Sequence, residues 1–262
     1  MSYDKTKAAR LAHIEQHLAV GFDLANAESH IVRGTGNPHA CVMHLDSHAI
    51  AMAQHAWFGA GDLAASRQWW YTAARLRKHL YETAPAQVFP LAQMLDLLAP
   101  LLSNDRATID WFGRQEAMLD AGRAADPRES EFLTVTVLLA IQGAWDAVAQ
   151  RSRQALATGS LTRRKIDHAH DFACLAALAN RDAPATAAAL TEIVGQKQRA
   201  ARGNFEGGYT AGLISTMATI YAKIAWHHGV AVDIRSPYVP SQWLPMSPVA
   251  EATTPYAFLR GR

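Results

Sequence analysis

Residues 43–81 read MHLDSHAIAMAQHAWFGAGDLAASRQWWYTAARLRKHLY, and this stretch predicts the fold of the chain. Its first half has no Gly or Pro and repeats apolar residues at helical spacing, namely Leu45, Ala49, Met52 and Ala56. Gly59 and Gly61 tolerate the backbone angles found just past a helix end, and Asp62 can cap the helix that follows. The stretch therefore predicts an αα-hairpin.

The second half of the stretch predicts a second helix, one face of which would pack against the first helix. The residues that recur on this face at three- and four-residue spacing are Leu63, Ser66, Trp70, Ala73, Arg77 and Leu80. Similar turns recur near 143–146 and 180–182, although the interval is not constant as it is in a tetratricopeptide array. We expect an all-α fold of about ten helices stacked as antiparallel αα-hairpins, with almost no sheet.

The rest of the chain divides into helices at turn-forming residues. We expect an opening helix over 4–32, a helix from Pro85, a helix opened by Leu161 and Thr162, a return helix over 184–202 and a last helix over 209–228. Residues 132–141 contain Thr134, Val135, Thr136 and Val137, whose propensity favours a strand. Because helical patterns flank this segment, we interpret it as a buried central helix.

After Gly229 the composition changes. Prolines at 237, 240, 245, 248 and 255 rule out regular helix, and Tyr238, Trp243, Leu244, Tyr256 and Phe258 are interleaved with them. The prediction is a single all-helical domain over 1–235 and a tail over 236–262, packed on that domain as an extended strap.

The charge and the cysteine positions argue against several classes of partner and site. Net charge is +2, from 25 Lys and Arg against 23 Asp and Glu, so neither nucleic acid nor a membrane is expected as a partner. Cys41 and Cys174 lie far apart in sequence and form no CxxC pair. The first residues are polar and no apolar run has membrane-spanning length, so we expect a cytoplasmic protein.

Histidines are the first candidate metal-binding residues. His44 and His48 are four residues apart on one expected helix, and His55 follows two turns later. A zinc-binding HExxH motif would need Glu at the position of Leu45. We favour surface or capping histidines over a metal site, and the sequence leaves open whether His44 and His48 bind a metal.

His168, His170 and Asp171 form a second cluster. An adjacent His-Asp pair in a helical protein resembles the HD phosphohydrolases, whose metals activate water for phosphoester cleavage. In this chain the dyad comes late, whereas in that family it comes early. The hydrolase remains the enzyme alternative, and its further ligands would be drawn from His44, His48, Asp182 and Asp233.

The layout as a whole resembles the immunity protein 49 family of bacterial polymorphic toxin systems. The resemblance covers residues from about 10 to 245 and is carried by 56–62, 69–74, 173–182, 225–229, Asp233 and 236–244. It implies a small helical protein that neutralises a cognate toxin domain by covering its active site or substrate surface. It implies no catalytic residue, no metal, no cofactor and no small-molecule substrate.

Tight binding of a toxin needs a few buried anchors, which are often aromatic or Arg. The candidate contacts are Trp69, Tyr71, Tyr238 and Trp243, each of which can equally belong to the core or to the packing of the tail. A third alternative is a helical scaffold that binds some other protein, and an adjacent toxin gene would distinguish immunity from it.

Overall fold

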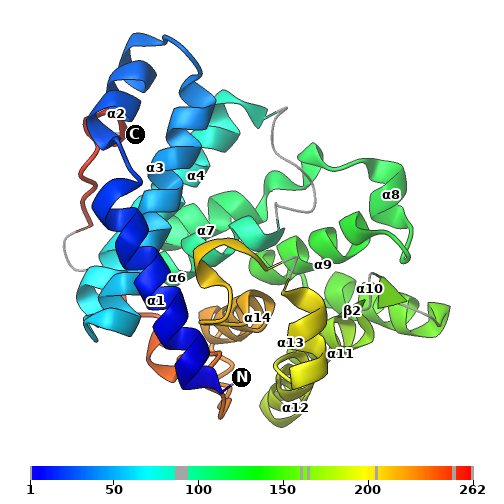
Figure 1. Cartoon of the computed structure of the whole chain (residues 1–262). Helices are drawn as coiled ribbons and strands as arrows, with labels where there is room; N and C mark the ends of the chain where they lie inside the picture. Colours follow the sequence, from blue (N-terminus) through cyan, green and yellow to red (C-terminus); the bar gives the residue numbers. More distant parts are fainter. Residues whose placement is uncertain are drawn as a thin grey trace. The chain divides into compact units, whose positions relative to one another are not determined.

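The computed structural model describes residues 2–85, 94–159, 162–163, 166–203, 206–249 and 252–260. Over these residues the chain is mostly helical with almost no strand (Figure 1), which confirms the all-α prediction. The described part contains thirteen α-helices, somewhat more than the ten expected. They are α1 (Tyr3–Val20), α2 (Leu24–Arg33), α3 (Pro38–Gln54), α4 (Leu63–Thr83), α6 (Leu98–Ser103), α7 (Arg106–Gly113), α8 (Ala121–Ala125), α9 (Ser130–Gln142), α10 (Trp145–Thr158), α11 (Ala169–Ala179), α12 (Ala183–Ile193), α13 (Gln196–Arg202) and α14 (Thr216–His227).

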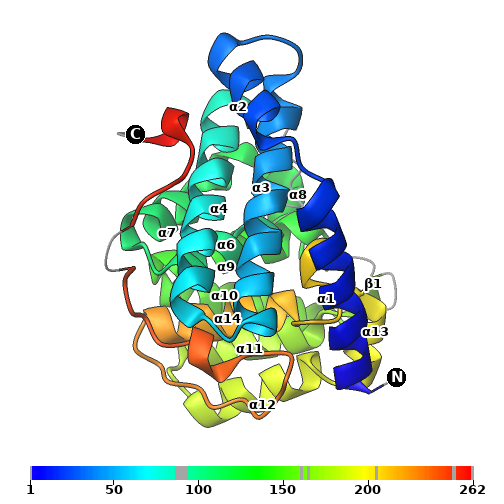
Figure 2. The same cartoon turned by 60° about the vertical axis from the view of Figure 1, so that its left-hand side comes forward.

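Helices α3 and α4 form the predicted hairpin and lie side by side in Figures 1 and 2. A single π-helical turn, His55–Gly59, ends α3, and Gly61 then adopts a φ of +70°. The Asp62 carboxylate accepts the Ala65 N–H at 2.9 Å, so it caps α4 as predicted. Across the hairpin, Ser66 Oγ donates to the Ala53 carbonyl at 2.9 Å, and both Ala73 and Trp70 are buried.

The chain divides into two compact units. Unit 1 contains the described residues of 2–85, 99–108 and 247–260, and unit 2 contains those of 94–98 and 109–246. The tail is therefore shared: residues 236–246 belong to unit 2 and the residues after 246 to unit 1. The predicted division into 1–235 and 236–262 stays a prediction.

Both parts of the tail lack α-helix, and each packs within its own unit. Short 3-10 turns occur at Ser241–Trp243 and Ala257–Leu259. In unit 2, Lys223 Nζ donates to the Trp243 and Leu244 carbonyls at 3.2 and 3.1 Å. In unit 1, the last residues run beside α4 toward α2 (Figure 2), where the Ala257 N–H donates to Glu28 at 2.7 Å.

Several predicted boundaries were wrong. The opening helix over 4–32 is two helices, because Gly21 ends α1 and the Asp23 side chain caps α2 by accepting the Asn26 N–H. Gly195 likewise divides the return helix over 184–202 into α12 and α13. The last helix, α14, begins at Thr216 and not at Tyr209, which lies in a 3-10 turn.

The segment after α10 also differs from its prediction. Leu161 lies outside the described residues, and Thr162 does not begin a helix: two short antiparallel strands, β1 (Thr162–Arg163) and β2 (Ile166–Asp167), precede α11. The helix expected from Pro85, with Val88, Leu91, Leu95, Leu98 and Leu102 on its buried side, begins on residues 86–93, which lie outside the described residues; of its later positions, Leu98 and Leu102 lie in α6 and are buried. The strand-like segment 132–141 is part of α9, and Phe132, Val137 and Leu138 are fully buried there, so its interpretation as a central helix is confirmed.

No described helix combines the length and the apolar character that a bilayer crossing requires.

Candidate functional site

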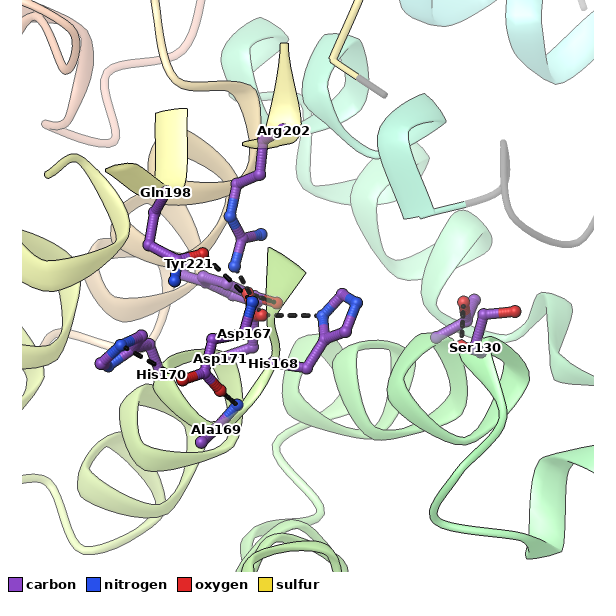
Figure 3. A network of polar contacts seen from close by, with 10 residues as sticks. Ser130, Asp167, His168, Ala169, His170, Asp171, Gln198, Arg202 and Tyr221 are labelled. Carbon is purple, nitrogen blue, oxygen red and sulfur yellow. Dashed lines mark hydrogen bonds and ion pairs between the residues drawn. The ribbon is translucent and has the colours of Figure 1, made fainter. Parts of the chain in front are cut away.

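A cluster of polar side chains is buried in unit 2 around Asp171 (Figure 3). Arg202 Nη2 and His168 Nδ1 donate to Asp171 Oδ2 at 2.7 and 2.9 Å. The Tyr221 hydroxyl donates to Asp171 Oδ1 at 2.9 Å. Asp171 and Tyr221 are fully buried and Arg202 is 1% exposed, so the cluster is closed to solvent on the Arg202 side.

Local structure brings these residues together from three helices. Asp167 Oδ1 accepts the N–H of Ala169, the first residue of α11, at 3.0 Å, and Asp171 lies in the first turn of that helix. Gln198 Oε1 in turn accepts the Asp167 N–H at 3.3 Å and ties α13 to β2. Arg202 is the last residue of α13, and Tyr221 lies in the middle of α14.

Electrostatics keep Asp171 ionised in this buried setting. Burial alone would raise the pKa of its carboxyl, but the charge of Arg202 and the hydrogen bond from His168 hold that pKa well below its usual range. Burial lowers the pKa of Arg202, but the pairing with Asp171 outweighs it, and the guanidinium pKa is raised above its ordinary value. Both shifts favour the charged forms of Asp171 and Arg202, whose ion pair joins α11 to α13.

Glu206 is a second buried carboxyl beside this pair. Its Oε2 accepts the Thr216 N–H at 2.6 Å, so it caps the N-terminus of α14. Burial raises the pKa of Glu206 to about 7, although Arg202 and the backbone donors act in the opposite direction. The two buried carboxyl groups are therefore shifted in opposite directions: the pKa of Asp171 is lowered and that of Glu206 is raised.

The adjacent His170 and Asp171 do not converge as a metal-binding dyad. Neighbouring residues of a helix point in different directions, and His170 Nε2 lies 3.9 Å from Asp167 Oδ2, while Asp171 faces Arg202 and Tyr221. Both carboxylate oxygens of Asp171 already accept hydrogen bonds from protein donors. Asp171 therefore serves as a structural link between helices.

The candidate histidines His44, His48 and His55 each contact other side chains, and His44 and His48 both pack on the Phe22 ring. His44 packs on the Phe22 ring, with centroids 4.9 Å apart, and His55 Nε2 lies 3.5 Å from a Glu15 oxygen. His48 is 8% exposed, and its Nδ1 is hydrogen-bonded to the Tyr256 hydroxyl at 3.2 Å. Over the described parts of the chain, no three His, Cys, Asp or Glu side chains gather closely enough to hold a metal ion.

Unit 1 carries a solvent-open groove of about 840 Å³. One wall is a face of α4 and the other is the tail segment 252–260. The residues that line it are Gln68, Trp69, Tyr71, Thr72, Arg75, Ala252, Thr253, Thr254, Pro255, Leu259 and Arg260. Two of the predicted partner contacts, Trp69 and Tyr71, thus lie in one groove, and both are half-buried.

The groove is held in shape by hydrogen bonds from both walls. Gln68 Nε2 donates to the Thr253 carbonyl, and Thr254 Oγ1 donates to the Tyr256 carbonyl at 3.1 Å. The Trp69 ring meets the His48 ring edge to face, with centroids 5.4 Å apart. Since His48 also holds Tyr256, one histidine links the aromatic side chain of the groove to its tail wall.

The other two predicted partner contacts, Tyr238 and Trp243, lie in unit 2 and do not line this groove. Trp243 is 3% exposed, so its side chain packs inside unit 2 and offers no surface to a partner. Tyr238 is half-buried, and the Arg199 guanidinium lies 3.6 Å from the centroid of its ring. Tyr238 thus has an intramolecular partner that packs against its ring.

Sequence reasoning expected a tail packed on the helices but did not place residues 252–260 against α4, and it missed the role of Arg202. Residues 252–255 and Arg260 join α4 across more than 170 positions of sequence, and Arg202 meets Asp171 across 31 positions. The only available signal for the groove was the WWY triplet at 69–71. Comparison with models of known protein families, with curated proteins and with solved structures finds no match for this chain.

Proposed function

We propose that this chain is an immunity protein that binds a cognate bacterial toxin in the cytosol and neutralises it by covering the toxin's active site or substrate surface. The observation that carries the proposal is the groove of unit 1, in which Trp69 and Tyr71 are half-buried and held against a fixed wall. Rigid aromatic side chains in a preformed surface suit tight protein binding, because little conformational entropy is lost. The resemblance to the immunity protein 49 family supports the same function.

The geometry of unit 2 adds an argument against the hydrolase alternative. The His170 and Asp171 side chains diverge, and the oxygens of Asp171 are engaged by Arg202, His168 and Tyr221. A two-metal hydrolase needs several carboxylate and imidazole ligands that point to a common centre. The scaffold alternative shares the fold with the immunity function and differs only in its partner.

The test is co-expression of this chain with the toxic product of the neighbouring gene. We expect a stable complex on size-exclusion chromatography and survival of the host. The double variant Trp69→Ala and Tyr71→Ala should weaken the complex and the protection, whereas Trp57→Ala, a truncation of another half-buried tryptophan in unit 1, should leave both intact. Wild-type protein that neither binds nor protects would remove the immunity proposal.

A further inference from the structure

Two aromatic side chains flank a polar stripe on the α4 wall of the unit 1 groove. Gln68 and Thr72 lie on one face of the helix, because their positions differ by four residues. At about 100° per residue, Trp69 and Tyr71 project to opposite sides of that stripe. A ligand that lies along the stripe therefore meets an aromatic ring on each side.

Each of the two rings also carries a hydrogen-bond donor that is open to a ligand. The Trp69 ring meets the His48 ring, yet within the described residues its Nε1–H has no hydrogen-bond partner. The Tyr71 hydroxyl likewise has none in the described parts of the chain. Because neither group is buried without a partner, both are accessible to solvent. The groove thus offers two donors to a ligand that carries acceptor atoms.

The tail of the chain shows how α4 holds an extended segment. Gln68 Nε2 donates to the Thr253 carbonyl, so a side chain of α4 binds the tail through its backbone. Pro255 belongs to the same wall, and Tyr256 after it has an extended backbone, with φ of −87° and ψ of 120°. The donors of the two flanking aromatics can make the same kind of contact with a second extended segment.

We infer that the groove binds an extended, proline-rich segment of a partner protein, whose carbonyl oxygens accept the Trp69 and Tyr71 donors and whose pyrrolidine rings pack on the two aromatic rings. Such segments adopt the polyproline II conformation before they bind, and their carbonyls make no internal hydrogen bonds. Proline also lacks an N–H, so the ligand needs donors more than acceptors. This inference rests on the proposed function, since the segment would belong to the toxin.

The length of the α4 wall sets the length of the segment. From Gln68 to Arg75 the helix advances about 10 Å, and polyproline II advances about 3.1 Å per residue, so about three or four ligand residues span the wall. Single-stranded nucleic acid is the competing ligand class, because bases also stack on aromatic rings. Its backbone is anionic and the net charge of the chain is only +2, so the observations favour a peptide.

The probe is a fluorescein-labelled peptide of about ten residues that repeats Ala-Pro-Pro, measured by fluorescence anisotropy against the purified chain. We expect saturable binding that weakens at least about tenfold when every Pro of the peptide is replaced by Ala, because the preformed conformation and the ring packing are lost. The double variant Trp69→Phe and Tyr71→Phe keeps both rings but removes both donors, and it should also lose at least about tenfold in affinity. Trp57→Phe removes the indole N–H of a half-buried tryptophan of unit 1 outside the groove, so it is the matched control and should bind as the wild type does.

The inference would be overturned by no binding of the proline-rich peptide, by equal binding of the proline-free peptide, by equal binding to the double variant, or by tighter binding of a single-stranded oligonucleotide. The same variants are then tested with the toxin. If wild-type protein binds the peptide but no toxin, the immunity function fails and the proline-binding groove stands. If the double variant binds and neutralises the toxin as well as the wild type does, the proline-binding groove fails and the immunity function stands.

Discussion

Removal of the Arg202 side chain tests whether the buried ion pair stabilises unit 2. Arg202→Met keeps most of the volume but leaves Asp171 fully buried with only His168 and Tyr221 as donors. Loss of one partner of a buried pair typically costs about 3–5 kcal/mol, because the remaining charge is desolvated without compensation. With a urea m value of about 2 kcal/mol/M, the unfolding midpoint should fall by about 2 M.

Cys174 offers a probe that reports on unit 2 alone. It is fully buried one turn after Asp171, whereas Cys41, the other cysteine, lies in unit 1. In a Cys41→Ser background, a thiol reagent labels the chain only when unit 2 opens. Labelling measured across a urea series should give the midpoint of unit 2, and Arg202→Met should shift it to lower urea.

The double variant Arg202→Met and Asp171→Leu is the control for the mechanism. It removes both charges, so it should be more stable than Arg202→Met alone, although one more side chain has changed. The reasoning would be refuted if Arg202→Met cost less than about 1 kcal/mol, or if the two single losses simply added in the double variant.

Three further results are expected. Relative to the wild type, Glu206→Gln should gain stability as pH rises from 5 to 8. Because the pKa of Glu206 is raised to about 7 in the folded state, its contribution to stability is fully present below about pH 4.5, and on the order of 3 kcal/mol of it is lost by neutral pH. A stability difference between the two proteins that stays constant with pH in urea unfolding would contradict this. Tyr256→Phe removes the hydroxyl bonded to His48 and should cost about 1 kcal/mol in urea unfolding, with no loss if the bond is unimportant. Trp243→Ala should cost about 3–5 kcal/mol because Trp243 is buried, and the half-buried Trp69 should cost clearly less when truncated in the same way, so equal losses would argue against the groove.

Local signals in the sequence were sufficient to predict the hairpins. Gly61 and Asp62 act on backbone within a few residues of themselves, and the turn at Arg181 and Asp182 repeats the arrangement, with Asp182 accepting the Ala185 N–H at 2.9 Å. The helix over 132–141 was predicted correctly because burial on all sides outweighs β propensity. Errors arose where a single Gly ended a helix inside an amphipathic pattern, as at Gly21 and Gly195.

The candidate site was only half accessible to sequence reasoning. Three adjacent aromatics on one helix cannot all point into the core, which indicated that at least one of them would be exposed or covered by the tail or a partner; Trp70 is the fully buried one. No local pattern reveals that residues 252–260 lie against that face, because the pairing of Gln68 with Thr253 depends on the tertiary fold. For the same reason the sequence around His170 and Asp171 does not reveal that Arg202, the charge partner of Asp171, lies in another helix.

The groove has an order of assembly that follows from its discontinuous sequence. Its α4 wall is synthesised early, but its second wall, residues 252–260, emerges from the ribosome only after the whole of unit 2 up to Met246 has been made. Chains fold from the N-terminus as they are synthesised, so α2, α3 and α4 form before the tail is made. Until then Glu28, His48 and Gln68 lack the hydrogen bonds that residues 253–257 supply. Nascent chains that end before residue 252 therefore lack the second wall of the groove, so the proposed binding of a toxin through the groove requires a chain synthesised past Arg260.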